Sequence, residues 1–139
     1  MRTRHVTRAA KVLRVYCPID SDTLNLLMIG QVSSIDKDGT LATILSIVRE
    51  DNPLGDFGKY KSVVELAPGW ELFTPDAAAR PTLGQPGTAA VSPTAILTIY
   101  IPEDGSVDAV SCAIDAIVEA HPWEVPVIEI TETLLVTRA

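Results

Sequence analysis

The residues with the clearest chemical potential lie in one short segment near the end of the chain, His121-Pro122-Trp123-Glu124. An imidazole has an unperturbed pKa of about 6.5, and a nearby carboxylate orients the ring and favours its charged form. His121 and Glu124 could therefore form a catalytic acid–base pair or two metal ligands. Two ligands are too few for a closed metal site, so a neighbouring subunit would have to add others. The competing interpretation is structural, with His121 bonding a helix-terminal carbonyl and Glu124 shaping the turn.

Other side chains that could bind a ligand are spread over the chain. Tyr16 and Tyr100 occupy matching places in two similar segments and could line a pocket, although sheet packing is the alternative. Lys59 and Arg80 lie in a loop-rich middle and could hold an anionic ligand. Glu129 in the last strand would point either to a cleft or to solvent. The full set of candidate ligand-binding residues is Tyr16, Lys59, Tyr60, Arg80, Tyr100, Trp123 and Glu129.

No cofactor is expected from the sequence. It contains no Walker loop, no dinucleotide-binding fingerprint and no Ser-His-Asp order. Cys17 and Cys112 are too few for a disulfide framework or a cysteine-based zinc site, and both lie in apolar segments. We therefore expect them to be buried, reduced thiols.

An internal repeat indicates how the chain positions these residues. Residues 13–20 read Leu-Arg-Val-Tyr-Cys-Pro-Ile-Asp, and residues 97–104 read Leu-Thr-Ile-Tyr-Ile-Pro-Glu-Asp. Each segment predicts an alternating apolar strand that a proline ends and a helix cap follows. Two such halves are typical of a ferredoxin-like α+β sandwich. The length of 139 residues fits a single domain.

The second half of the chain has a regular pattern. Residues 95–101 predict a strand, and Asp104 or Ser106 caps a helix that runs to about residue 120. His121-Pro122 ends this helix, and residues 127–136 predict a long strand. The apolar helix positions predict a buried face made of Val107, Val110, Ile114, Ile117 and Val118.

The first half is less regular. Residues 1–10 are basic and predict a flexible tail, and residues 12–17 predict a strand. Helices are predicted over about 22–29 and 38–51, while 29–35 could form an extra strand. In the middle, 60–66 and 70–73 flank Ala67-Pro68-Gly69, which predicts an extra hairpin, and a proline-punctuated loop follows.

Composition limits the class of protein. The mean hydropathy is +0.24 with 47% hydrophobic residues, so a partner should cover apolar surface. A membrane is a poor candidate because no apolar run reaches the roughly 18 residues needed to span one, and the N-terminus lacks a signal-peptide core. A net charge of −7 argues against nucleic acid. These features favour a cytoplasmic protein with an apolar subunit interface.

Several spaced motifs resemble a known family. They are Gly58-x-Tyr60, Phe73-x-Pro75, Ala79-x-Pro81-x-x-Gly84-x-x-Gly87 and His121-Pro122-Trp123-Glu124-Val125-Pro126. Their order resembles the small domain inserted in the dinuclear-metal-centre proteins (GTP cyclohydrolase type-two homologues), which also occurs alone. The closing segment is similar to that of CutA. The resemblance covers residues 58–130 well and 12–20 fairly, and it leaves about 20–50 as an insertion in the N-terminal half.

The resemblance implies a CutA/PII-like, ferredoxin-like fold and homotrimers held by sheet-edge pairing. It also implies small ligands or metal ions in clefts between subunits. The catalytic metal ligands of the dinuclear-metal-centre proteins lie in their main domain, which this chain lacks, so that activity does not transfer. The chain departs from the family pattern at Lys59, Val63, Trp123 and Val125, where the family has Asn, Cys, Tyr and often Glu.

Two functions of different kinds remain open from the sequence. The leading expectation is a homotrimeric CutA/PII-like module that binds a small ligand or metal ion at intersubunit clefts. The alternative is a small cofactor-independent enzyme of isomerase or cyclase type that uses His121 or Glu124 as an acid–base group. A purely structural role in a larger complex is a third interpretation.

Overall fold

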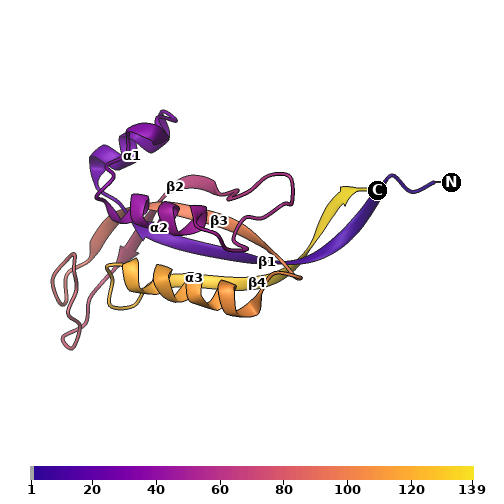
Figure 1. The fold of residues 1–139 in the computed structure, drawn as a ribbon. Helices are drawn as coiled ribbons and strands as arrows, with labels where there is room; N and C mark the ends of the chain where they lie inside the picture. Colours follow the sequence, from indigo (N-terminus) through magenta and orange to yellow (C-terminus); the bar gives the residue numbers. More distant parts are fainter. Residues whose placement is uncertain (1) are drawn as a thin grey trace.

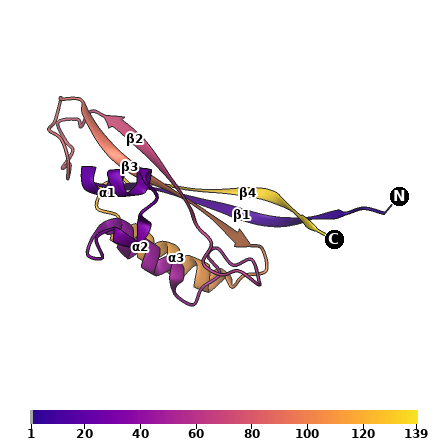
Figure 2. The same ribbon diagram turned by 90° about the horizontal axis from the view of Figure 1, so that it is seen from above.

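The computed structural model describes residues 2–139 and shows an antiparallel sheet with helices packed on one face (Figure 1). Within these residues the sheet has four strands in the order β2-β3-β1-β4. Figure 2 shows α2 and α3 together on one side of the strands. The elements are β1 (His5–Pro18), α1 (Ser21–Met28), the 3-10 helix η1 (Val32–Ser34), α2 (Thr40–Arg49), β2 (Glu65–Phe73), β3 (Ala90–Pro102), α3 (Val107–Ala120) and β4 (Val127–Arg138).

The core lies between the two central strands and the helices. Successive side chains of a strand point to opposite faces, so every second residue of β1 and β3 meets the helices. The fully buried strand residues on that face are Leu13, Val15 and Cys17 of β1 with Ala95, Leu97 and Ile99 of β3. Burial of such aliphatic side chains is the main stabilising term of the fold.

The helices form where the sequence predicts them, although one buried face is shifted. Asp20 is the N-cap of α1, where its carboxylate accepts a hydrogen bond from the Thr23 N–H, and Ser106 is the N-cap of α3. In α3, Ala113 and Ile117 are buried, whereas Val107 is 79% and Val118 46% exposed. The predicted stripe therefore included two residues that lie outside the contact with the sheet. No helix within residues 2–139 is long and apolar enough to cross a membrane.

The first strand is longer than predicted and forms a projecting arm with the last. β1 begins at His5, so residues 5–10 belong to a strand and not to a tail, while Met1 lies outside the described residues. β1 pairs with β4 from His5↔Arg138 onward, but with β3 only from Ala10↔Pro102. Residues 5–9 and 134–138, hereafter the arm, are therefore a two-stranded ribbon. The arm projects past the helices and carries both termini (Figure 1).

The predicted hairpin at residues 67–69 is a single continuous strand. β2 runs through Pro68 and Gly69 and pairs with β3 along its whole length. Pro68 is tolerated because β2 is an edge strand, where a missing N–H breaks no ladder bond on the solvent side. Gly69 lets Ile96 approach closely, since a Cβ there would lie 3.0 Å from the Ile96 Cδ1. Pro68 and Gly69 are typical of a turn, but both also fit the backbone of an edge strand, so they did not indicate a turn here.

The structure decides one open alternative of the sequence analysis and contradicts one of its expectations. Residues 29–35 do not form the possible extra strand: a turn in which Gly30 has a left-handed φ of 75° leads into η1. Cys17 is buried as expected, whereas Cys112 is exposed on the outer side of α3. The segment 20–50, expected as an insertion, contains α1, η1 and α2.

Candidate functional site

The structure divides most of the predicted site residues between two regions. Tyr16, Arg80, His121, Trp123 and Glu124 gather where β1 ends and α3 passes into β4, hereafter the junction. Tyr100, Lys59 and Tyr60 lie on β3 and on the loop 52–62, nearer the arm. Glu129 lies on β4, between these two groups, and its carboxylate contacts the Arg14 guanidinium of β1 at 3.4 Å.

His121 is bonded within the chain through both ring nitrogens. It is 6% exposed, and its Nε2 lies 2.7 Å from the carbonyl oxygen of Tyr16. The backbone N–H of Trp123 donates to Nδ1 at 3.2 Å. A neutral ring with its proton on Nε2 satisfies both contacts, donating to Tyr16 and accepting from Trp123. In this arrangement the imidazole joins the end of α3 to β1.

Glu124 and Arg80 hold two loops together. The backbone N–H of Arg80 donates to the Glu124 Oε1 at 2.9 Å, so Arg80 contributes its main chain to this contact. Thr82 Oγ1 donates to the Pro122 carbonyl at 2.8 Å. These bonds fix the loop 74–89 against residues 121–126. A tilted aromatic contact supports them, with the Phe73 and Trp123 centroids 5.2 Å apart and an interplanar angle of 58°.

The interior near the junction disfavours charge. Burial raises the pKa of the Cys17 thiol to about 12, and the Glu71 charge adds to the effect. Burial also raises the pKa of Glu71, whose Oε1 is buried without a hydrogen-bond partner. Cys17 is therefore an unreactive thiol. A cavity of about 590 Å³ lies beside the junction and includes Trp123 and Leu83 in its walls, but His121 and Glu124 do not line it.

A second cavity, hereafter the arm cleft, lies between the arm and the loop 52–62. Its volume is about 500 Å³. Tyr100 is the predicted ligand-binding residue that lines it, whereas Lys59 and Tyr60 belong to the same loop but lie outside the lining. The side chains and backbone that line the arm cleft include Arg8, Leu135 and Thr137 of the arm, Asp56, Phe57 and Gly58 of the loop, and Tyr100, Pro102, Glu103 and Asp104.

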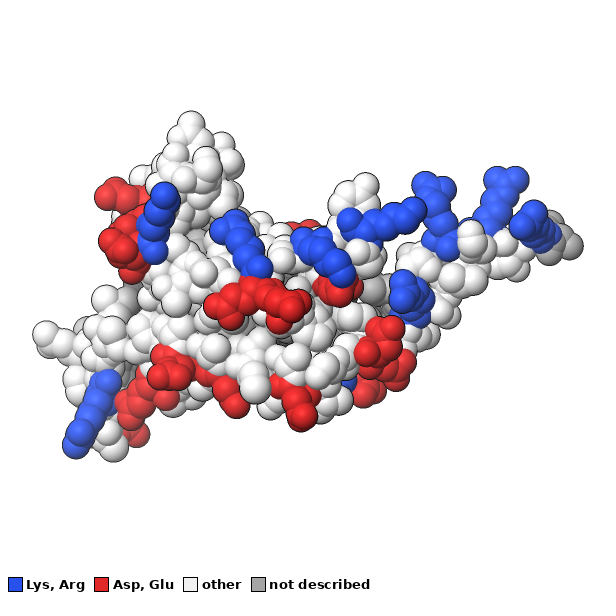
Figure 3. Space-filling model, viewed as in Figure 1, with Lys and Arg blue, Asp and Glu red and all other residues white. Residues whose placement is uncertain are grey.

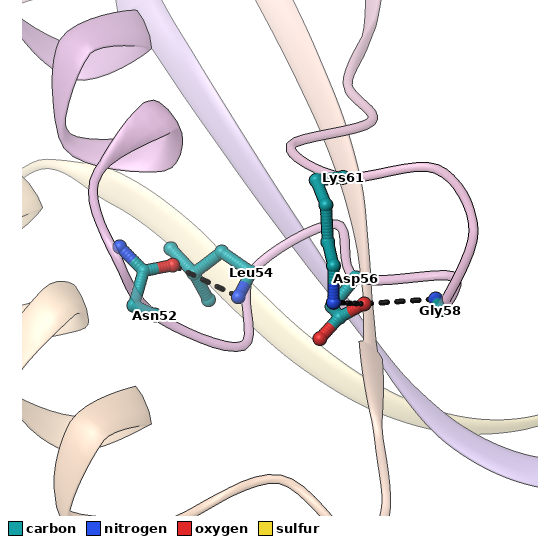
Figure 4. A network of polar contacts seen from close by, with 5 residues as sticks. All are labelled: Asn52, Leu54, Asp56, Gly58 and Lys61. Carbon is teal, nitrogen blue, oxygen red and sulfur yellow. Dashed lines mark hydrogen bonds and ion pairs between the residues drawn. The ribbon is translucent and has the colours of Figure 1, made fainter.

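The loop wall of the arm cleft is held by a network of hydrogen bonds (Figure 4). Asp56 Oδ1 accepts from the Lys61 ammonium and from the Gly58 N–H, each at 2.8 Å. The Lys61 bond and then the Gly58 bond hold the pKa of Asp56 below its usual value. At the start of the loop, Asn52 Oδ1 accepts from the Leu54 N–H at 2.9 Å. These contacts give the loop a fixed shape without help from a ligand.

Gly55 anchors this loop to the sheet. Its N–H donates to the Tyr100 carbonyl, and its own carbonyl accepts from the Val63 N–H, both at 2.9 Å. Its φ is 70°, and a Cβ at this position would lie 2.4 Å from the Val63 oxygen. Only glycine fits both constraints. The anchored loop places Phe57 edge-on to Tyr100, with centroids 6.1 Å apart and an interplanar angle of 69°.

Sequence reasoning missed most of the arm cleft. Arg8 was assigned to a tail, and Phe57, Glu103 and Asp104 were not considered as ligand groups. The turn-rich run Asn52-Pro53-Leu54-Gly55-Asp56 was the available signal, because such runs build fixed loops from side-chain-to-backbone bonds. Within residues 2–139 no group of three or more His, Cys, Asp or Glu is placed to hold a metal ion.

Comparison with known proteins identifies a shared fold. No protein-family model matches the sequence, and no curated protein matches it. Among solved structures, a Bacillus cereus protein related to NIF3 is similar, with a TM-score of 0.60 and 14% sequence identity. The match covers 94% of this chain and 27% of the other, so this chain spans about a quarter of its neighbour. NIF3 proteins are the dinuclear-metal-centre family, so the structural neighbour belongs to the family that the sequence motifs resemble.

Proposed function

We propose that the chain is a CutA/PII-like, ferredoxin-like module that forms a homotrimer and binds a small ligand in the arm cleft. The fold assignment is supported by the sheet order β2-β3-β1-β4 and by the two helical crossovers. One crossover joins β1 to β2 through α1 and α2, and the other joins β3 to β4 through α3. This is the arrangement of two β-α-β halves that the internal repeat predicts.

The exposed apolar surface of the arm is the observation that best supports the proposed homotrimer. Leu134 is 65%, Val136 71% and Val6 45% exposed, and all three lie on the two-stranded ribbon. An isolated two-stranded ribbon is marginally stable in water, and exposed apolar area costs roughly 25 cal/mol per Å². β4 also presents an unpaired edge. A neighbouring copy that packs on the arm would cover the exposed apolar side chains and pair with the free edge of β4.

The same assembly would place the arm cleft at a subunit boundary. Arm residues form one wall of the cleft, so a neighbour that covers the arm lies beside the ligand. The volume of about 500 Å³ suits a small molecule. A bound metal ion would need ligands from that neighbour, because residues 2–139 of one chain provide no group of three.

The enzyme alternative is less well supported by the geometry. An acid–base role would require His121 to break one of its two backbone contacts, and Glu124 to release the loop 74–89. Leaving a buried partner of His121 unbonded carries a penalty of about 1–3 kcal/mol. We therefore assign both residues to holding the junction and place the proposed binding function at the arm cleft.

Light scattering of the purified chain tests the assembly. We expect the mass of three copies of the 14.9 kDa chain. The double variant Leu134→Asp with Val136→Asp should give a monomer, because charge on the arm would prevent burial. Val107→Asp is the control, since Val107 is 79% exposed on α3 and does not belong to the arm. A monomer mass for the unchanged chain at micromolar concentration would overturn the trimer.

A further inference from the structure

Charges of opposite sign line the arm cleft without pairing with each other. Two ion pairs occur within residues 2–139, and they join Arg14 to Glu129 and Lys61 to Asp56. The remaining charged groups of the cleft, Arg8, Glu103 and Asp104, take part in neither pair. Figure 3 shows a related separation on a larger scale: basic side chains gather toward the projecting end of the molecule, and the Asp and Glu side chains lie over the body, where some basic side chains are also found.

This separation specifies what kind of molecule could bridge the cleft. A guanidinium such as that of Arg8 binds a carboxylate through two parallel N–H bonds. The carboxylates of Glu103 and Asp104 accept hydrogen bonds from an ammonium group. Asp56 is excluded from this role because Lys61 already neutralises it. Arg8 on one side and Glu103 and Asp104 on the other therefore match a ligand that carries one carboxylate and one cationic group.

Apolar side chains line the arm cleft together with the charged groups. Phe57 and Tyr100 lie edge-on to each other in the lining, which also includes Pro102 and, on the arm, Leu135. Hydrocarbon of a ligand would pack on these side chains, and a cation near the ring faces would gain a further attraction. Because Gly55 and Asp56 already fix the loop, little ordering is needed when a ligand enters.

We infer that the arm cleft binds a small zwitterion of the amino-acid type. Arg8 holds its carboxylate, Glu103 and Asp104 hold its ammonium group, and its apolar stem lies against Phe57 and Tyr100. The inference rests on the proposed ligand-binding function and names the ligand class for that same cleft. It does not depend on the trimer, because every group involved belongs to one chain.

Calorimetry with three six-carbon probes tests the inference on the full chain. The probes are ε-aminocaproate, which carries both charges, caproate, which carries the carboxylate alone, and hexylamine, which carries the ammonium alone. We expect ε-aminocaproate to bind at least about tenfold more tightly than either of the others, a difference of about 1.4 kcal/mol.

Variants test which side chains of the cleft bind the carboxylate of the probe and which bind its ammonium group. Arg8→Met should weaken ε-aminocaproate about tenfold and leave hexylamine unchanged. Arg4→Met is the matched control, because Arg4 is a nearby cation that does not line the cleft. Glu103→Gln combined with Asp104→Asn should weaken ε-aminocaproate and hexylamine but not caproate.

Light scattering on the same samples separates the two proposals. A trimer that does not bind ε-aminocaproate, or that binds caproate or hexylamine equally well, overturns the zwitterion inference. A monomer that binds ε-aminocaproate with the expected selectivity supports the inference and overturns the trimer. Equal losses of ε-aminocaproate affinity in Arg8→Met and Arg4→Met would also overturn the zwitterion inference, because they would show a general effect of the net charge.

Discussion

The junction and the arm cleft use polar groups in opposite ways. At the junction, His121 and Glu124 accept or donate hydrogen bonds to neighbouring backbone, so their polar atoms are engaged within the chain. In the arm cleft, Arg8, Glu103 and Asp104 are exposed and take part in neither ion pair of residues 2–139. In this geometry His121 and Glu124 hold the junction together, whereas charged groups without an ion-pair partner lie in the arm cleft.

The difference shows that residue type is a weaker guide to function than the bonds a residue already makes. A histidine whose two nitrogens are engaged by backbone must lose a contact before it can act on a substrate. Arg8, on a strand that projects beyond the core, is in neither ion pair and can bind a ligand without breaking one. Changes at the junction should therefore reduce stability, and changes at the arm cleft should reduce binding.

The largest expected effect comes from Gly55→Ala, which acts on the wall of the arm cleft. A non-glycine residue in the left-handed region costs about 1–2 kcal/mol, and the Cβ would also lie 2.4 Å from the Val63 oxygen. We expect a total loss of roughly 3 kcal/mol in the free energy of unfolding. The loop should also shift, so ε-aminocaproate binding should fall. Urea unfolding and calorimetry on the same variant measure both.

Gly58→Ala is the matched control for that substitution. Gly58 has a φ of 82°, but nothing lies within 4 Å of the position a Cβ would take. The backbone penalty of about 1–2 kcal/mol should then be the whole effect. Equal destabilisation by the two substitutions would show that the contact with Val63 does not anchor the loop.

Strong local signals made much of the fold predictable. The apolar period and a cap at Asp104 or Ser106 predicted α3, and the alternating residues 12–17 predicted the middle of β1. Two errors came from signals whose meaning depends on tertiary position. Pro68-Gly69 reads as a turn but fits an edge strand, and the charged residues 5–10 read as a tail but are held by pairing with β4. Strand order and strand pairing depend on residues that are far apart in the chain, so a local sequence pattern does not predict them.

The candidate site was less predictable than the fold. Of the two tyrosines that could line a pocket, Tyr100 lines the arm cleft, and the other lining residues come from the arm, the loop 52–62 and the turn after β3. These segments meet only because β1 pairs with β3 and β4 together. Arg8 carries no local mark that distinguishes it from Arg2 or Arg4. Its placement in a cleft is a consequence of register, which a single sequence does not reveal.

A smaller effect on stability is expected from His121→Ala at the junction. The substitution leaves the Tyr16 carbonyl and the Trp123 N–H without their partner, which costs about 1–3 kcal/mol. Binding of ε-aminocaproate per folded chain should be unchanged, because His121 does not line the arm cleft. His5→Ala, on the exposed arm, is the control for stability. Lost binding with an unchanged melting temperature would instead place the ligand site at the junction.

The smallest expected effect concerns Glu71, on the β2 strand. Burial raises the pKa of its carboxyl in the folded protein, so folding favours the protonated form. As the pH rises from the ordinary glutamate value, about 4.3, towards the raised pKa, the unfolded chain ionises first and the folded state loses stability. Glu71→Gln cannot ionise and should therefore melt at a higher temperature than the unchanged chain near neutral pH. The difference should shrink as the solution is made more acidic.

Melting temperatures of both proteins across this pH range check the sign of the effect. The gain should be modest because Glu71 is only partly buried, and water screens part of its charge. Glu65→Gln is the control, since Glu65 lies on the same strand and is exposed. A difference for Glu71→Gln that stays constant with pH would show a packing effect of the amide. A difference that grows on acidification would mean that the carboxylate is stabilised in the fold, and the environment near the junction would then favour charge as the arm cleft does.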